Sequence, residues 1–394
     1  MKLRTSRDRI GRLLRLLQHR ESGYPPVSFK GNSVTLYPDG SSFFEALFDA
    51  LSAARTSICL EYYIIRADRT GSRLADELTR AVARGVRVYL IYDYIGCLDT
   101  PASFFQQLEN SGVVCLAFNP PTFRRGIRWF DRRDHRKLAL IDGVKAFLGG
   151  INISDSYSGV AATEKRFRDV GFCMTGDAVD QLTEIFSDAW FMERGVRPNI
   201  PARCEFHEPG SMKDEVTLIA GGPHQRRSAI RTAFRFAIAS ANSEILIANP
   251  YFLPGPLIVR SLLRARSRGV SIRLLLPARS DVPIVRLLSR STYSPLLEAG
   301  IEIYELQREL LHAKLMLIDG IRTVIGSANL DQRSFHRNFE INAIIRSQQF
   351  GSQIRKLYEE DLLVSRKITL NEHQSRGLFA RLLESLLKPI CWFL

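Results

Sequence analysis

Apolar residues along this chain recur in patterns that predict the same series of short strands and helices twice. Continuous or alternating apolar runs are typical of strands, and apolar positions three or four residues apart are typical of helices. In the first half the patterns predict strands at 34–37, 58–65, 86–92 and 113–118 and helices at 43–54, 72–84 and 102–111. In the second half they predict strands at 216–220, 245–248, 270–276 and 301–306 and helices at 228–240, 256–268 and 284–298. Strands that alternate with helices indicate an α/β fold, with mixed α and β structure and mixed sheets.

Both series end in two short apolar strands that are separated by an Asp-Gly turn. These strands are expected at 138–141 and 146–148 in the first half and at 315–318 and 323–325 in the second. The stretch 195–213 holds three prolines and no periodic pattern, which is typical of a linker. We therefore predict two similar domains, at 30–194 and 214–365, each a mixed sheet flanked by helices.

The two predicted hairpins carry the same polar residues in the same register. The first copy reads His135-x-Lys137-x4-Asp142-x6-Gly149-Gly150-x-Asn152, and the second reads His312-x-Lys314-x4-Asp319-x6-Gly326-Ser327-x-Asn329. Every position of the second copy lies 177 residues after its counterpart, from 135 to 312 and from 152 to 329. An acidic residue follows each copy in a matching strand, Asp169 after the first and Glu340 after the second. One such motif could arise by chance, whereas two in register indicate two halves of one site.

Two histidines, two lysines and two asparagines around one anion suit the chemistry of a phosphodiester. Attack on phosphorus needs a nucleophile, donors for the non-bridging oxygens and an acid for the leaving alkoxide. A neutral imidazole of one half can attack while a protonated imidazole of the other half serves the leaving oxygen, and the roles then reverse. We take His135 as the first choice of nucleophile and leave the opposite assignment, to His312, open.

The remaining motif residues support this reaction. Lys137 and Lys314 supply fixed positive charge. The residues expected to bind the phosphate, as amide donors or as small residues that permit its close approach, are Asn152, Asn329, Ser327 and Gly150. Asp169 and Glu340 are suited to hold the second nitrogen of each histidine, which fixes the tautomer and raises the basicity. This chemistry requires no metal, and we expect no cofactor.

Composition favours a polyanionic partner without identifying it. A formal net charge of +14 and a pI near 9.7 suit a nucleic acid or an anionic bilayer surface. A length of 394 residues with 45% apolar content suits a globular protein of two to three domains. The six cysteines have neither C-x-x-C nor metal-ligand spacing, so we expect reduced thiols. No stretch approaches the roughly 18 to 20 continuous apolar residues of a membrane-spanning helix.

Three basic segments could contact a polyanion. Six arginines interleaved with aromatic residues lie between positions 120 and 137, and we assign contact with lipid to Arg124, Arg125, Arg128 and Trp129. Arginine and aromatic side chains suit lipid headgroups but also single-stranded nucleic acid, and a solvated loop is the simpler alternative. Segments 1–29 and 366–394 each combine an apolar helical face with basic residues, which is typical of helices that lie in the membrane plane.

The paired H-x-K-x4-D motifs resemble those of the phospholipase D superfamily. Within it, four phrases are similar to bacterial cardiolipin synthases: Leu60-Glu61-Tyr62-Tyr63-Ile64, Asn249-Pro250-Tyr251-Phe252-Leu253-Pro254, Gly149-Gly150-Ile151-Asn152, and the stretch from Ser327-Ala328-Asn329-Leu330-Asp331 to Asn338-Phe339-Glu340. The similarity covers roughly residues 30 to 365, and the paired motif is more specific than the flanking phrases. The chain resembles the shorter type of this family, without the N-terminal spanning helices of the longer type.

The resemblance implies two phospholipase D-like domains that share one active site. It implies transfer of a phosphatidyl group from phosphatidylglycerol to an acceptor hydroxyl through a covalent phosphatidyl-histidine intermediate. Asp142 and Asp319 belong to the catalytic motif, and the resemblance implies that they support its strands rather than react. We therefore expect a peripheral enzyme on the cytoplasmic side of the bacterial inner membrane, with phosphatidylglycerol and an acceptor phospholipid as substrates.

Other hypotheses stay open. The six catalytic residues of the two H-x-K-x4-D motifs could also hydrolyse phospholipids or cleave nucleic acid, although we expect no nucleic-acid partner. A noncatalytic relic that binds lipid or nucleic acid is disfavoured because neither motif is degraded. The acceptor could be phosphatidylglycerol, phosphatidylethanolamine or a small alcohol.

Overall fold

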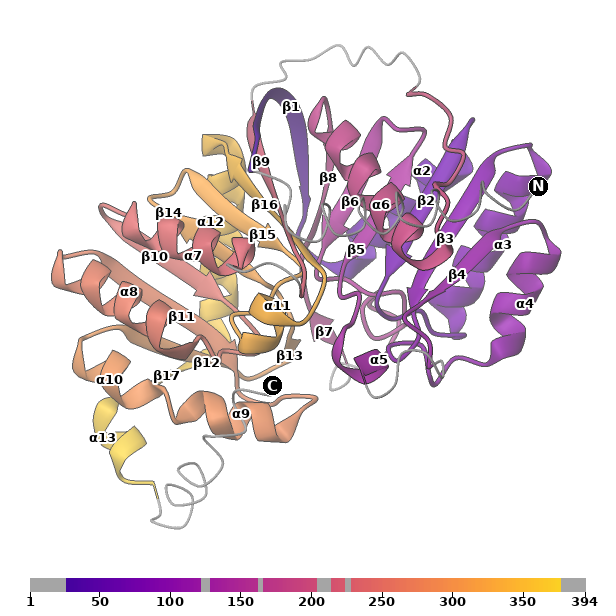
Figure 1. The fold of residues 1–394 in the computed structure, drawn as a ribbon. Helices are drawn as coiled ribbons and strands as arrows, with labels where there is room; N and C mark the ends of the chain where they lie inside the picture. The colour runs from indigo at the N-terminus through magenta and orange to yellow at the C-terminus, as the bar shows by residue number, and fades with distance from the viewer. Residues whose placement is uncertain (1–25, 122–127, 162–165, 204–213, 224–227, 377–394) are drawn as a thin grey trace, which may run out of the picture.

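Strands and helices alternate through both halves of the chain (Figure 1), as the sequence predicts. The computed structural model describes residues 26–121, 128–161, 166–203, 214–223 and 228–376. The elements of the first half are β1 (Ser28–Tyr37), α2 (Gly40–Ser52), β2 (Ser57–Tyr62), α3 (Arg69–Ala83), β3 (Arg87–Asp93), α4 (Ala102–Asn110), β4 (Val114–Phe118), α5 (Arg128–Asp131), β5 (Lys137–Ile141), β6 (Lys145–Gly149), β7 (Phe167–Arg168), β8 (Gly171–Thr175) and α6 (Ala178–Arg194). Aspartates cap α2 and α3, where Asp39 accepts the Ser42 N–H and Asp68 the Gly71 N–H.

The second half repeats the main order of strands and helices, with one helix divided and with β17 and α13 added at its end. Its elements are β9 (Asp214–Gly221), α7 (Ala229–Ala239), β10 (Glu244–Ala248), α8 (Gly255–Ser267), β11 (Ser271–Pro277), α9 (Pro283–Arg290), α10 (Tyr293–Glu298), β12 (Glu302–Leu306), β13 (Leu310–Leu311), β14 (Leu315–Ile318), β15 (Arg322–Gly326), α11 (Gln332–His336), β16 (Glu340–Arg346), α12 (Gln348–Leu363), β17 (Ser365–Ile368) and α13 (Leu370–Gln374). The single helix predicted at 284–298 is wrong. Pro295 lacks the N–H that would continue the helical ladder to Ser291, and the chain breaks there into α9 and α10.

In the described part of the chain, one 15-stranded sheet runs through both halves. Its order is β17-β12-β11-β10-β14-β15-β16-β9-β1-β8-β6-β5-β2-β3-β4. The halves meet where β1 pairs antiparallel with β9, near the centre of Figure 1, and the order on one side of that joint mirrors the order on the other. β17 is an additional edge strand on the second half. The predicted class, a duplicated α/β fold with mixed sheets, is confirmed.

Helices cover both faces of this sheet. Side chains of α6 and α12 pack on one face in a buried apolar cluster to which both halves contribute, including Phe172 of β8 and Leu218 of β9. On the other face, α2, α3 and α4 cover the first half, and α7 and α8 cover the second. The shared cluster holds the halves in a fixed relation, which a site built from both requires.

Two short cross-connections join the halves away from the main sheet. β7 of the first half pairs in parallel with β13 of the second, with Phe167 opposite Leu310 and Arg168 opposite Leu311. An isolated bridge likewise joins Asp134 to Phe339. The first connection is followed directly by Asp169 and His312, and the second by His135 and Glu340. The two halves are therefore joined right beside the motif histidines and the acids that follow the motifs.

The predicted boundaries of the domains stay predictions, but the elements bear on two of them. α6 ends at Arg194 and β9 begins at Asp214, while residues 1–25, 204–213 and 377–394 lie outside the described residues. Within the predicted membrane segment 366–394, β17 and α13 belong to the folded second half. None of the helices in the described ranges is long and apolar enough to cross a membrane.

Candidate active site

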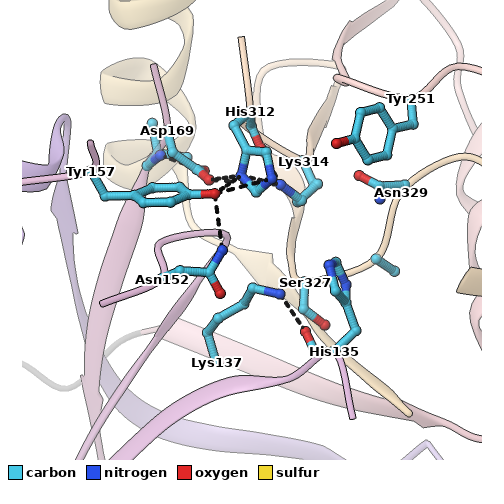
Figure 2. Close-up of polar contacts among 12 residues, drawn as sticks. His135, Lys137, Asn152, Tyr157, Asp169, Tyr251, His312, Lys314, Ser327 and Asn329 are labelled. Carbon is cyan, nitrogen blue, oxygen red and sulfur yellow. Dashed lines mark hydrogen bonds and ion pairs between the residues drawn. The ribbon is translucent and has the colours of Figure 1, made fainter. Parts of the chain in front are cut away.

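The duplicated motifs meet in one cavity of about 520 Å³ between the halves. Both motif histidines and both motif asparagines line it. The other lining residues used below are Tyr63, Arg66, Arg133, Tyr157, Phe167, Tyr251, Asp281, Asp331 and Arg333. Figure 2 shows the histidine and lysine of each motif side by side, with the two motifs brought together in one site.

His135 stands just before β5 and is held by the second half. Its main-chain N–H donates to the Phe339 carbonyl at 2.9 Å, and its Nδ1 lies 3.0 and 3.1 Å from the carboxylate oxygens of Glu340. Glu340 also accepts from Ser327 Oγ and from Asn338 Nδ2. Within the described residues, Nε2 of His135 has no hydrogen-bond partner and faces the cavity, so this nitrogen is available to a substrate.

His312 is held by the first half in the same way. Its main-chain N–H donates to the Arg168 carbonyl at 2.8 Å, and its Nδ1 lies 2.6 Å from Asp169 Oδ2. The carboxylates are therefore exchanged, because each histidine is oriented by an acid of the opposite half. The sequence pairs each acid with a motif along the chain but does not specify this exchange.

Burial keeps both imidazoles neutral. It is the main cause that lowers the pKa of His135 to about 4, against the opposing effect of Glu340. Burial also lowers the pKa of His312, and Lys314 adds to that effect. For Glu340, burial acts to raise the pKa, but His135 and Lys137 outweigh it and the pKa is lowered. The pairs are therefore neutral imidazoles beside carboxylates, as a nucleophile or general base requires.

Both motif lysines are buried beside their histidines. Lys137 Nζ donates to the His135 carbonyl at 2.6 Å, and Lys314 Nζ donates to the His312 carbonyl and lies 2.6 Å from His312 Nδ1. Burial is the main cause that lowers the pKa of Lys137 to about 7, and it also lowers the pKa of Lys314. An anion that enters the cavity would compensate for this burial by stabilising the charged lysines.

The two motif asparagines have different surroundings. Asn152 Nδ2 donates to the hydroxyl of Tyr157 at 2.9 Å, and that hydroxyl lies 3.3 Å from Nε2 of His312. The side-chain oxygen of Asn329 is buried without a hydrogen-bond partner in the described chain. Tyr157 has Ser334 as its counterpart 177 residues later, so the duplication is not symmetric here.

Gly150 and Ser327 are not among the residues that line the cavity, and direct contact of these two residues with phosphate stays a prediction. A Cβ placed on Gly150 would lie 2.8 Å from Asp169 Cγ, so the carboxylate occupies the space that a side chain would need. In the other half, Ser327 is fully buried and donates its hydroxyl to Glu340. At both positions the residue is therefore matched to the neighbouring carboxylate.

The motif aspartates lie at the hairpin turns, at the far end of the strands from the histidines. Asp142 has a φ of 56° and accepts the main-chain N–H groups of Arg55, Thr56 and Ser57. Asp319 has a φ of 52° and accepts equivalent bonds from Asn242, Ser243 and Glu244. Neither aspartate lines the cavity, so they belong to the catalytic motif without touching the site.

Sequence reasoning did not assign the aromatic side chains around the histidines. The ring of Tyr63 lies 4.9 Å from that of His135, and the rings of Tyr157 and Phe167 lie 5.2 and 5.1 Å from that of His312. Tyr251 also lines the cavity and bonds to Asp281 at 2.7 Å. Tyr63 and Tyr251 could have been noticed in the sequence, because they lie in the phrases similar to cardiolipin synthases. Those phrases do not show how the two side chains are oriented.

The arginine-rich run before His135 is partly structural. Arg133 is buried and pairs with Asp93 at 3.1 Å, and Arg136 is buried and pairs with Glu61 at 3.0 Å. These two arginines therefore cannot contact a lipid surface, contrary to the interpretation of the whole run as an interface. Arg124 and Arg125 lie outside the described residues, and Arg128 and Trp129 belong to α5, with side chains outside the description. Contact of these four residues with lipid stays a prediction.

Other chemistry is sparse in the described part of the chain. No group of three or more His, Cys, Asp or Glu side chains there could hold a metal ion. Four of the six cysteines are described, and all four are buried free thiols: Cys59, Cys97, Cys115 and Cys173.

Comparison with known proteins identifies the family. The model described as "Cardiolipin synthase, PLD-like domain" matches residues 47–190 and 235–362. The chain is 35% identical over 394 residues to cardiolipin synthase 2 of Bacillus anthracis, covering 96% of this chain and 76% of the relative. The chain belongs to the cardiolipin synthase family of phospholipase D-like proteins. Cardiolipin synthase of Geobacillus thermodenitrificans is 36% identical over 375 residues, with 93% and 74% covered.

Solved structures support the fold of this family member. Phosphatidylserine synthase of Haemophilus influenzae aligns with a TM-score of 0.69 at 13% identity, over 96% of this chain and 97% of that one. Polyphosphate kinase of Porphyromonas gingivalis aligns with a TM-score of 0.55 at 16% identity, over 91% and 55%. The family match and the curated relatives confirm the resemblance to phospholipase D-like cardiolipin synthases and the enzyme class, a phosphatidyltransferase.

Proposed function

We propose that this phosphatidyltransferase makes cardiolipin by moving a phosphatidyl group from phosphatidylglycerol to a hydroxyl of an acceptor phospholipid. Phospholipid substrates follow from the family, and the choice of donor and acceptor is the proposal. The observation that carries it is the pair of exchanged His–carboxylate contacts, at 3.0 and 2.6 Å, facing one cavity. This arrangement supplies two imidazoles to one phosphate, as two-step transfer requires.

In the first step, Nε2 of His135 attacks the donor phosphorus. A P–N bond forms and the bond from phosphorus to the glycerol oxygen breaks. His312, which takes up a proton once the phosphate anion lies beside it, gives that proton to the departing oxygen. Glu340 stabilises the positive charge that develops on His135, and the charged lysines stabilise the phosphate oxygens. His135 is preferred as nucleophile because its Nε2 is unpaired in the described chain, whereas Nε2 of His312 lies 3.3 Å from the Tyr157 hydroxyl.

In the second step, the acceptor hydroxyl replaces the departed glycerol. His312, now neutral, removes the hydroxyl proton while the oxygen forms a bond to phosphorus. The P–N bond breaks and its electron pair returns to His135. Asp169 holds His312 in the orientation that both steps need.

A single incubation tests the transfer and the intermediate together. Purified protein with vesicles of isotope-labelled phosphatidylglycerol should yield cardiolipin and glycerol, and acid-quenched digests should carry a phosphatidyl adduct on the peptide with His135. An adduct on the His312 peptide would reverse the two roles. Phosphatidic acid as the only lipid product would identify a hydrolase, and loss of activity with EDTA would indicate metal-assisted hydrolysis instead.

We further propose that the enzyme works at the cytoplasmic surface of the inner membrane. The net charge of +14 and the basic amphipathic ends of the chain support binding to anionic bilayers. Removal of 377–394 should lower vesicle flotation and cardiolipin synthesis together, and should leave cleavage of a soluble phosphodiester intact. Flotation should weaken with salt. Tight binding and cleavage of single-stranded DNA, with no preference for anionic vesicles, would favour a nuclease.

A further inference from the structure

Arg333 brings a positive charge to the active-site cavity without an ion-pair partner in the described chain. It lies on α11, and its side chain lines the cavity together with those of Arg66 and Arg133. Arg66 pairs with Asp99 at 3.0 Å, and Arg133 pairs with Asp93. By contrast, the guanidinium of Arg333 has no hydrogen bond and no ion pair in the part of the chain that the structure describes.

Asp331 forms no ion pair with Arg333 in the described chain, although Arg333 acts against burial to lower the pKa of that acid. Asp331 turns its carboxylate to the start of α11, where it accepts the N–H of Ser334 at 2.6 Å. Asp331 is fully buried, and burial is the main cause that raises its pKa to about 7, which weakens its charge near neutral pH. Arg333 also contributes, after burial, to lowering the pKa of Arg133. Asp68 and Asp281 also line the cavity, but in the described chain neither pairs with Arg333, so its guanidinium is available to an anion.

Joining two phospholipids brings a second anion into the cavity. The phosphorus under transfer lies between the two histidines, beside the buried motif lysines. An acceptor such as phosphatidylglycerol has a phosphate of its own, separated from the attacking hydroxyl by only three carbons of glycerol. That phosphate must leave bulk water with the rest of the headgroup, which is costly unless a cation receives it. Water and free glycerol carry no phosphate, so as acceptors they need no cation of this kind.

We propose that Arg333 binds the phosphate of the acceptor phospholipid, and so selects an anionic lipid with a free hydroxyl as the second substrate. The planar guanidinium matches two phosphate oxygens at once, which holds the headgroup in one orientation. The hydroxyl oxygen then forms its bond to phosphorus, the P–N bond to histidine breaks, and the hydroxyl proton passes to the other histidine. This assignment rests on the phosphatidyl transfer proposed above.

The test compares two acceptors in the same vesicles. Phosphatidylglycerol vesicles are incubated with labelled glycerol, and the protein is assayed both for cardiolipin formation and for exchange of the label into phosphatidylglycerol. Exchange uses the same donor, the same intermediate and the same membrane surface, but an acceptor without phosphate. Arg333→Gln should lower cardiolipin formation by roughly tenfold or more, as loss of a hydrogen bond to a charged group implies. Exchange should stay within about twofold.

Two variants serve as controls. Arg333→Lys keeps the charge and should recover part of cardiolipin formation. Arg337→Gln removes the same charge from the end of the same helix, where Arg337 pairs with Asp131 and does not line the cavity, and it should leave both reactions unchanged.

The outcomes separate this inference from the proposed function. Equal losses of both reactions in Arg333→Gln would overturn the assignment, because Arg333 would then serve the donor step or the fold. Unchanged cardiolipin formation would overturn it as well. If the unsubstituted protein exchanges glycerol but makes no cardiolipin, the proposed function itself fails, and it fails independently of Arg333.

Discussion

The buried amine of Lys137 makes the charge of the site sensitive to pH. A pKa near 7 means that Lys137 loses its proton as the pH rises above neutrality, whereas an exposed lysine would keep it. The pKa of His135, near 4, means that its imidazole stays neutral down to moderately acidic pH. Between these limits the free enzyme combines a neutral nucleophile with a charged lysine.

We therefore expect kcat/KM to pass through a broad maximum, with an acidic limb near pH 4 and an alkaline limb near pH 7. Lys137→Arg should move the alkaline limb upward, because a guanidinium keeps its proton. An alkaline limb that does not move would assign the titration to another group. The measurement is the pH profile of glycerol exchange on phosphatidylglycerol vesicles.

Stability should respond to the same two groups. Lys137 has a lowered pKa, so between pH 7 and its unfolded value near 10.5 the unfolded chain holds more protons and this contribution to stability rises with pH. His135 also has a lowered pKa, so its contribution falls as the pH drops from about 6.5 to about 4. Both effects reflect the cost of burying the protonated, charged form of the side chain.

Each histidine alone should be indispensable. His135→Ala and His312→Ala should each abolish turnover, and the double variant should be scarcely worse, because nucleophile and acid act as one unit. His336→Ala is the matched control, since His336 bonds to Arg231 and does not line the cavity. Mass spectrometry measures cardiolipin synthesis by each variant. Near-normal synthesis by a folded single variant would disprove the shared site.

At the scale of residues, the sequence predicts which side chains belong to the site better than it predicts how they are arranged. The repeated motif indicates His135 and His312, because two copies in one register are hard to explain otherwise. It cannot indicate Tyr157, whose hydroxyl reaches His312 through a contact between residues 155 positions apart. For Gly150 the motif suggests contact with phosphate, whereas only the fold shows that Asp169 occupies the space beside it.

At the scale of elements, the motif hairpins depend on the aspartates at their turns. Asp142→Ala should lower the free energy of unfolding by roughly 2–4 kcal/mol, because three main-chain N–H groups lose their acceptor. Thermal unfolding measures this, with Asp49→Ala on the exposed face of α2 as control. A variant of unchanged stability that lost all activity would instead assign Asp142 a chemical role.

Element prediction succeeded where periodicity is local and failed where tertiary contacts decide. The alternation of strands and helices follows from apolar spacing, so both halves were recognised. β7 and β13 have two residues each and form only because they pair across the halves, so no local pattern reveals them. The break between α9 and α10 could have been predicted, because Pro295 stands inside the helical run.

At the scale of the molecule, an ion pair supports the junction of the halves. Arg168 pairs with Asp361 of α12 at 2.8 Å, and their side chains are 13% and 14% exposed. Arg168→Ala should destabilise the protein by roughly 2–4 kcal/mol, because Asp361 stays behind as an unpaired buried acid. Activity should also fall, since the main chain of Arg168 holds His312.

The control for this prediction is Arg197→Ala. Arg197 pairs with Asp188 at the surface, where its side chain is 51% exposed, and its loss should cost no more than about 1 kcal/mol. The free energy of unfolding of both variants is measured by chemical denaturation. Equal losses would show that the ion pair at the junction stabilises the protein no more than the surface pair does.

The exchanged carboxylates have a consequence for the order in which the protein is made. Glu340 lies 205 residues after His135, so a chain still emerging from the ribosome contains the first histidine long before its acid. Asp169 is made early but has no histidine to orient until residue 312 has followed. Chains that end before residue 312 therefore hold neither pair, and chains that end before residue 340 lack the acid that orients His135, so the site cannot be complete until most of the protein has been made.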